Sequence, residues 1–153
     1  MIPHKDPHQD RLGRLIGRAG KVMKQRLTRN MHLSGFEFAP EQLILLAIVQ
    51  SLEGVNQQTL TEFFGHDKTA TTRNIDVLED KKLVVRVPDK EDRRQNMIFL
   101  TDMGRETLAT WLPVVDKTEQ EALQGISQQD IQICKEVLRK VTENLSNCSD
   151  TKG

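Results

Sequence analysis

The spacing of apolar residues changes once between residues 68 and 100, from a helical period to an extended one. In "KTATTRNIDVLEDKKL", Thr71, Ile75 and Leu78 lie four and three residues apart, which predicts one inward helical stripe. The runs "LVVRV" and "NMIFL" that follow are rich in β-branched and apolar residues, and they flank the charged segment "PDKEDRRQ". This pattern predicts a β-hairpin with a charged tip, joined directly to the helix.

A short helix is predicted immediately before this one. Asn56 can cap a helix that contains Leu60, Gly65 and His66 form a break, and Asp67 can cap the helix from residue 68. A short helix, a turn with glycine and a second helix with hydroxyls and cations on its outer face indicate a helix-turn-helix. The hairpin would then be the wing of a winged helix.

Further helices are predicted on both sides of this unit. Residues 11–33 carry apolar side chains at steps of three and four, and the largely apolar helix 40–54 is expected in the centre of the core. Thr101 can cap a long helix, in which Pro113 predicts a kink or break near residue 110, and Ser127 can open a last amphipathic helix. The predicted fold class is mainly α with a small β-hairpin.

Length and charge limit the organisation of the chain. With 153 residues, one domain is expected, with residues 40–100 as the winged helix-turn-helix and residues 1–10 and 148–153 as flexible ends. The 22 basic residues balance the 22 acidic ones, so attraction to a polyanion has to come from local clusters of cations.

Several classes of function are disfavoured by the sequence. No run of eighteen apolar residues and no secretory leader is present, so a cytoplasmic protein without a membrane partner is expected. The chain has no P-loop, HExxH, GxSxG or GxGxxG motif, which argues against an enzyme, and no cofactor is implied. One Trp, five Phe and no Tyr offer few surfaces for stacking single-stranded bases.

Two groups of polar residues are candidates for contact with double-stranded DNA. An α-helix fits the major groove, and a thin basic ribbon can enter the minor groove, where the negative potential is strongest. The helix would contribute Lys68, Thr69, Thr72 and Arg73, and the hairpin tip would contribute Lys90, Arg93 and Arg94. Each group alone is also typical of a solvated surface, and it is their adjacency that favours DNA binding. Asp92 is expected to pair with Arg94 or to hold the turn while one arginine projects.

Residues 66–106, "HDKTATTRNIDVLEDKKLVVRVPDKEDRRQNMIFLTDMGRE", resemble the signature of the multiple antibiotic resistance regulator (MarR) family. The shared features are a Thr-Arg pair in the recognition helix, "LE.K.LV.R" before the wing, "DRR" at its tip and "LT..G" after it. "FAPEQLILLAIV" is similar to the second helix of the family with its buried Gln. The resemblance covers residues 10 to 147. The chain departs from the family pattern at three positions. Ala70 stands where a hydroxyl is frequent, and Asn74 stands where an apolar residue is frequent. Pro88 lies before Asp89, whereas the family often has Pro after Asp.

The resemblance implies a homodimeric repressor in which residues 11–33 and 102–147 supply dimerisation helices. The expected interface residues are Leu12, Leu15, Ile16, Val137, Leu138 and Val141. Two recognition helices about 34 Å apart would match a palindromic operator. The resemblance also implies a small aromatic or phenolic effector, which would bind between the dimer helices and the winged domain. No residue of the chain identifies that effector.

Alternative interpretations remain open at this stage. The apolar stripes of the first and last helices could pack on each other within one chain, and the winged helix could bind proteins instead of DNA. Cys134, on the apolar side of the last helix, is expected to be buried and inert, whereas Cys148 could be oxidised. A redox-responsive regulator that acts through Cys134 or Cys148 is a further alternative function. Cations of residues 11–29 could lie on a membrane or pair with acids such as Glu119 and Glu136. A metal site formed by His4, Asp6, His8 and Asp10 is disfavoured by Pro7.

Overall fold

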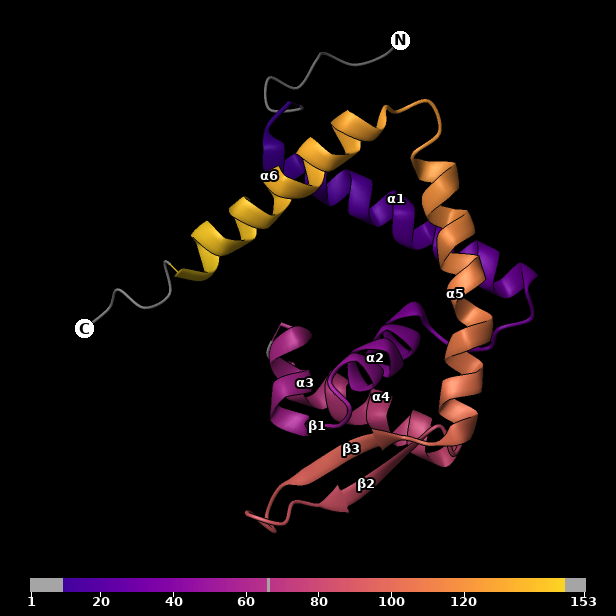
Figure 1. The fold of residues 1–153 in the computed structure, drawn as a ribbon, viewed down its shortest axis with the longest axis vertical. Helices are drawn as coiled ribbons and strands as arrows, with labels where there is room; N and C mark the ends of the chain where they lie inside the picture. The colour runs from indigo at the N-terminus through magenta and orange to yellow at the C-terminus, as the bar shows by residue number, and fades with distance from the viewer. Residues whose placement is uncertain (1–9, 66, 148–153) are drawn as a thin grey trace. The chain divides into compact units, whose positions relative to one another are not determined.

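A computed structural model describes residues 10–65 and 67–147. The chain divides into two compact units, one ending at Thr118 and the other beginning at Glu119. In chain order the elements of Figure 1 are α1 (Leu12–Leu33), α2 (Pro40–Ser51), β1 (Val55–Asn56), α3 (Gln57–Phe63), α4 (Lys68–Asp80), β2 (Val84–Pro88), β3 (Asn96–Leu100), α5 (Asp102–Ala122) and α6 (Gln128–Asn147). The predicted flexible ends fall outside the described residues, except for Asp10.

Side-chain caps set the starts of α3, α4 and α6, and all three were predicted. The carboxamide oxygen of Asn56 accepts the N–H of Thr59 at 2.8 Å, at the start of α3. A carboxylate oxygen of Asp67 accepts the N–H of Ala70 at 2.9 Å, at the start of α4. At α6, Ser127 Oγ accepts the N–H of Asp130 at 3.1 Å. These bonds satisfy N–H groups that have no partner within the helix, and so they fix where each helix begins.

Helix α2 lies at the centre of the core, as predicted. Four of its apolar side chains are almost completely buried: Leu43, Leu45, Leu46 and Val49. Ile44 keeps 40% of its surface exposed, so one side of the helix is open to solvent. The other core residues come from the elements around it: Met31, Val55, Leu60, Ile75, Leu78, Leu83, Val84, Ile98, Leu100, Leu108, Trp111 and Val114. Burying each large apolar side chain contributes about 1.5 to 3 kcal/mol, so this cluster holds the helix-turn-helix and the hairpin in one unit.

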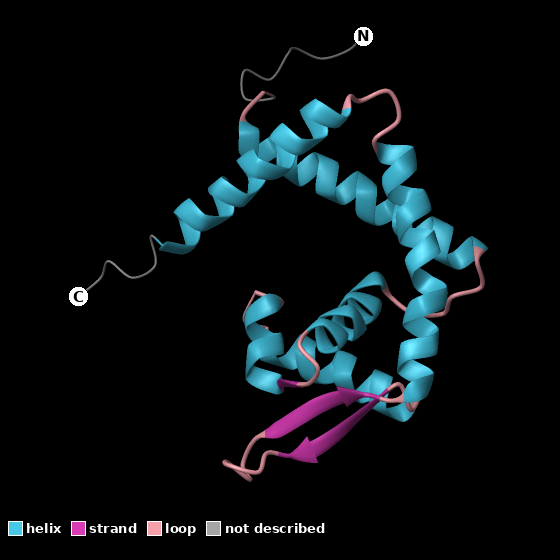
Figure 2. Ribbon diagram, viewed as in Figure 1, coloured by secondary structure: helices cyan, strands magenta, loops and turns pink. Residues whose placement is uncertain are grey.

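The hairpin is confirmed as β2 and β3, and it carries one further strand. β3 lies in the middle of an antiparallel sheet of order β1-β3-β2, in which Ile98 pairs with Val55 on one side and with Arg86 on the other (Figure 2). The two-residue strand β1 was not predicted, because two residues are too short to show an alternating pattern. It ties the segment before α3 to the base of the wing.

The segment "LT..G" joins the wing to α5. Thr101 Oγ1 donates to the carbonyl of Lys82 at 2.7 Å and accepts the N–H of Gly104 at 3.0 Å. A Cβ added at Gly104 would lie 2.1 Å from the carbonyl oxygen of Leu83, so no larger residue fits there without moving the backbone. Thr101 and Gly104 together therefore hold the first turn of α5 against the start of β2.

Of the kink or break predicted near residue 110, a break does not occur. Helix α5 continues through Pro113 from Asp102 to Ala122. A proline removes one backbone hydrogen bond, and burial of Trp111, Val114 and Thr118 on the same helix outweighs that loss. Among the described helices, none has the combination of length and apolar character that crossing a bilayer requires.

Candidate nucleic-acid interface

Helix α4 presents a basic and hydroxyl-bearing face to solvent. Its buried stripe of Thr71, Ile75 and Leu78 packs into the core, as the sequence pattern predicted. Thr71 Oγ1 donates to the carbonyl of Asp67 at 2.8 Å, which keeps this hydroxyl inside. The opposite face exposes Lys68, Thr69 and Arg73, whereas Thr72 is half-buried; with Asp76 these four residues line a shallow hollow. The structure therefore brings the four predicted helix residues onto one accessible surface.

The tip of the wing uses its acids to hold the turn. Asp92 accepts the backbone N–H of Arg94 at 3.0 Å with one carboxylate oxygen and the side-chain amide of Gln95 at 3.2 Å with the other. Asp89 accepts the backbone N–H of Glu91 at 2.7 Å. Of the two roles expected for Asp92, holding the turn is the one observed, since its bond to Arg94 is to the main chain. Lys90, Arg93 and Arg94 remain exposed.

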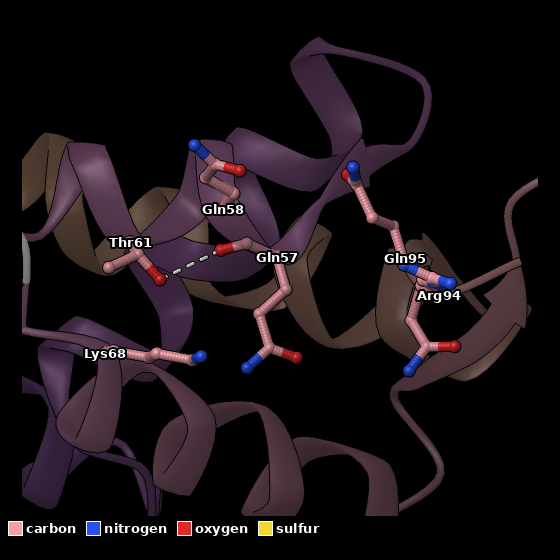
Figure 3. A pocket seen from close by; sticks show the side chains of 7 residues that line it. Gln57, Gln58, Thr61, Lys68, Arg94 and Gln95 are labelled. Carbon is pink, nitrogen blue, oxygen red and sulfur yellow. Dashed lines mark hydrogen bonds between the residues drawn. The ribbon is translucent and has the colours of Figure 1, made fainter. Parts of the chain in front are cut away.

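A polar cleft of about 460 Å³ lies where α3, α4 and the wing meet (Figure 3). Its lining contains no acidic residue, and consists of Gln57, Gln58, Thr61, Lys68, Arg94, Gln95 and Asn96. In Figure 3, the ends of Lys68 and Gln57 point toward one another from α4 and α3, with Arg94 and Gln95 across from them on the wing. The cleft thus combines two cations with several hydrogen-bond donors, a composition suited to an anionic oxygen.

The two wing arginines line different surfaces. Arg94 lines the polar cleft together with Lys68, whereas Arg93 and Lys90 line a separate hollow with Pro88 and Asp89 at the tip. Sequence reasoning grouped these cations and missed the uncharged members of the cleft. The one signal for them was the polar first turn of α3, "QQT", which is unremarkable without its position beside Lys68.

An ionic clamp, which was not predicted, connects the recognition helix to the wing. The guanidinium of Arg86 on β2 pairs with Asp76 and Glu79, both on α4. Glu79 also accepts the backbone N–H of Arg86 at 3.2 Å. The Arg86 side chain is only 18% exposed. Because these bonds join α4 to β2 directly, they fix the orientation of the helix face relative to the hairpin.

The predicted dimer residues are accessible in the single chain. Leu12, Leu15 and Ile16 on α1 and Val137 and Leu138 on α6 each keep between 38% and 51% of their surface exposed, and Val141 is half-buried. Among the cations of α1, Lys24 pairs with Glu41 of α2. Glu119 pairs with Lys135 and Glu136 accepts the amide of Gln132, so these two acids have partners in their own unit.

Cys134 is exposed, which corrects the expectation of a buried thiol. The reason is that α6, in the single chain, leaves most of its apolar side uncovered and buries only Ile131 among its described side chains. The described residues contain no cluster of His, Cys, Asp or Glu able to hold a metal. His4, Asp6, His8, His66 and Cys148 lie outside the described residues.

The comparisons with known proteins point to one family. Residues 34–95 match the family model described as MarR family. The HTH-type transcriptional regulator YdgJ of Bacillus subtilis (strain 168), itself uncharacterised, is 28% identical over 106 residues, which cover 69% of this chain and 65% of that regulator. The chain therefore spans slightly less than two thirds of the length of this curated relative.

Solved structures resemble this chain over most of its length. The reduced form of MarR from E. coli is 26% identical, with 85% of this chain and 95% of that chain covered and a TM-score of 0.72. A mutant MarR from E. coli, complexed with operator DNA, is 24% identical with coverage of 90% and 99% and a TM-score of 0.78. BpsR of Bordetella bronchiseptica, whose DNA binding is regulated by 6-hydroxynicotinic acid, is 18% identical with coverage of 92% and 97% and a TM-score of 0.79.

The family match covers the helix-turn-helix and most of the wing, and the structural likeness extends over the flanking helices. Through this winged helix-turn-helix, the chain is similar to the MarR family over residues 34–95, and its fold is similar to that of MarR from E. coli.

Proposed function

We propose that this chain is a sequence-specific transcription regulator that binds double-stranded DNA and acts as a repressor in the cytoplasm. The observation that carries this proposal is the exposed face of α4 beside an acid-free cleft and a basic wing tip. The family relatives support it, since one of them is complexed with operator DNA. A chain without net charge has no general attraction to DNA, so these local cations have to supply it.

Each part of this surface has a distinct role in the proposal. Thr69, Thr72 and Arg73 face base edges in the major groove, where side chains can distinguish all four base pairs. Lys68 and Arg94 each bind a backbone phosphate at the polar cleft, which fixes the position of the protein without reading sequence. Arg93 and Lys90, at the outer side of the tip, enter the minor groove.

The proposed active form is a homodimer. A single recognition helix makes few contacts, whereas two related by a two-fold axis about 34 Å apart read a palindrome on one face of the duplex. The exposed apolar residues of α1 and α6 are the surfaces that a second copy would cover. The regulation of BpsR by 6-hydroxynicotinic acid supports a small aromatic or phenolic acid as effector.

Salt dependence of duplex binding tests the proposal. Each phosphate contact lowers the slope of log affinity against log salt by about 0.9, so Lys68 and Arg94 of two subunits predict a slope near −3.6 or steeper. Binding should therefore weaken by about a hundredfold or more between about 50 and about 200 mM salt. A winged helix that binds proteins instead would show no such duplex binding.

Two substitutions separate the roles. Arg73→Ala should cost about 1 to 3 kcal/mol and relax base preference at one position per half-site. Arg94→Ala should weaken binding to all duplexes alike and make the salt slope less steep by about 2 per dimer. Arg105→Ala on α5 removes the same charge outside this surface and serves as the control. Equal effects of Arg94→Ala and Arg105→Ala would contradict the phosphate assignment.

A further inference from the structure

Gln57 of α3 makes a hydrogen bond to the recognition helix that constrains the chemistry of one hydroxyl. Its side-chain amide donates to Thr72 Oγ1 at 2.7 Å, and both side chains are half-buried. Gln57 lines the polar cleft and Thr72 lines the hollow on α4, so the bond lies between these two cavities. A hydroxyl has one proton to donate and lone pairs to accept, and here a lone pair is occupied by the amide.

The proton of Thr72, like those of Thr59, Thr69 and Thr107, has no acceptor within the described part of the chain, whereas most other helical threonines have one. Thr71, the adjacent residue, donates to the carbonyl of Asp67 at 2.8 Å. Four other helical threonines also donate to the carbonyl one turn earlier: Thr28, Thr61, Thr118 and Thr142. Such a bond is the usual outcome for a helical hydroxyl, and it leaves the proton unavailable to a ligand.

We propose that Gln57 is a positioning residue that fixes Thr72 as a hydrogen-bond donor, so that Thr72 recognises an acceptor atom of the DNA. This inference rests on the proposed function. Acceptance of the amide N–H polarises the hydroxyl and strengthens it as a donor. Suitable acceptors in the major groove are N7 and O6 of guanine, N7 of adenine and O4 of thymine, whereas the amino groups of cytosine and adenine cannot accept this proton. A phosphate oxygen has the same acceptor chemistry.

A double-mutant cycle on duplex affinity tests this role. Thr72→Val removes the hydroxyl with little change of shape, and Gln57→Met removes the amide while keeping the chain length. Each should weaken binding of the dimer to the selected operator by roughly 5- to 150-fold, the effect of one hydrogen bond lost in each of the two subunits. Because Gln57 acts through Thr72, Gln57→Met should have no further effect in the Thr72→Val background.

Reversing the direction of the hydrogen bond between residue 57 and Thr72 gives a sharper test. Gln57→Glu places an acceptor beside Thr72, so the hydroxyl proton turns inward, and binding should fall further than with Gln57→Met. The same change in the Thr72→Val background measures the effect of the added charge alone. Thr72→Ser keeps the hydroxyl and should retain the wild-type base preference. Gln58→Met, an exposed neighbour in the same cleft, is the matched control and should show no coupling to Thr72.

Base preference distinguishes the two sources of the acceptor. If the partner is a base, selection from random duplexes with Gln57→Met or Thr72→Val should lose the preference at one position per half-site. If it is a phosphate, both variants should weaken all duplexes equally. Equal effects of Gln57→Met in both backgrounds would overturn the inference while leaving DNA binding intact. A wild-type chain that selects no duplex would overturn the inference and the proposed function together.

Discussion

Replacement of Arg86 by methionine should remove the ion pairs that join the wing to α4 while leaving most of the side-chain volume in place. Methionine keeps much of the aliphatic volume but removes the guanidinium that pairs with Asp76 and Glu79. Both carboxylates are more than one third exposed, at 55% and 39%, so water can replace much of what they lose.

The expected cost lies between that of a surface pair and that of a buried one. Exposed ion pairs contribute about 0 to 1 kcal/mol, and hydrogen bonds to charged groups about 1.5 to 3 kcal/mol. With two partners and a mostly buried guanidinium, we expect Arg86→Met to lower the free energy of unfolding by about 1 to 2 kcal/mol. With a denaturant slope of about 1 to 3 kcal/mol/M, the urea midpoint should fall by roughly 0.3 to 2 M.

Fluorescence of Trp111 provides the assay. It is the single tryptophan of the chain and is buried in the core, so its emission reports unfolding of the unit that contains the wing. Arg105→Met is the control, because the ion pair of Arg105 with Asp102 spans 3.4 Å between side chains that are both more than half exposed. All titrations need equal protein concentration, since dimerisation shifts apparent stability. If Arg86→Met shifted the midpoint no more than Arg105→Met, the clamp would not stabilise the wing.

Three further perturbations follow from the structure. Gly104→Ala should destabilise the fold by about 1 to 3 kcal/mol in the same urea assay, because its Cβ would meet a backbone carbonyl, whereas Gly13→Ala meets nothing within 4 Å and should be neutral or stabilising. The hydrogen bond and charge of Lys24 hold the pKa of Glu41 below its ordinary value, outweighing partial burial, which raises it. The stability that Glu41 gains from Lys24 should be present above the ordinary glutamate pKa and lost as pH falls through the lower pKa of the folded state. Glu41→Gln should remove this part of the acid dependence of the urea midpoint. An unchanged pH profile of the midpoint would contradict the pairing. Leu138→Glu on the exposed face of α6 should convert dimers to monomers in analytical ultracentrifugation, and a stable dimer would exclude this face from the interface.

Local signals explain why most of the fold could be predicted. Asn56, Asp67 and Ser127 are capping residues followed by apolar residues at helical spacing, so they marked helix starts that the structure confirms. The hairpin was evident because two β-branched runs flank a charged turn. Strand β1 and the continuity of α5 through Pro113 were missed, because pairing with β3 and burial of the helix decide them, and neither is local.

The candidate site was predictable only in its charged members. Lys68 and Arg94 stand out as cations, but their meeting in one cleft depends on how α3, α4 and the wing pack. The bond from Gln57 to Thr72 spans 15 residues between uncharged side chains and has no periodic signature. Glu79 and Arg86 belong to the motif "LE.K.LV.R", but no local pattern shows that they pair with each other or that Asp76 joins them.

Selection of bound duplexes from a random pool tests the central claim most directly. The account predicts enrichment of a palindrome whose half-sites lie about 10 to 10.5 base pairs apart, or a multiple of that spacing, because two recognition helices have to meet one face of B-form DNA. Enrichment should disappear at one position per half-site with Arg73→Ala. A pool that shows no enriched sequence, or an enriched sequence unaffected by Arg73→Ala, would contradict the assignment of α4 to the major groove.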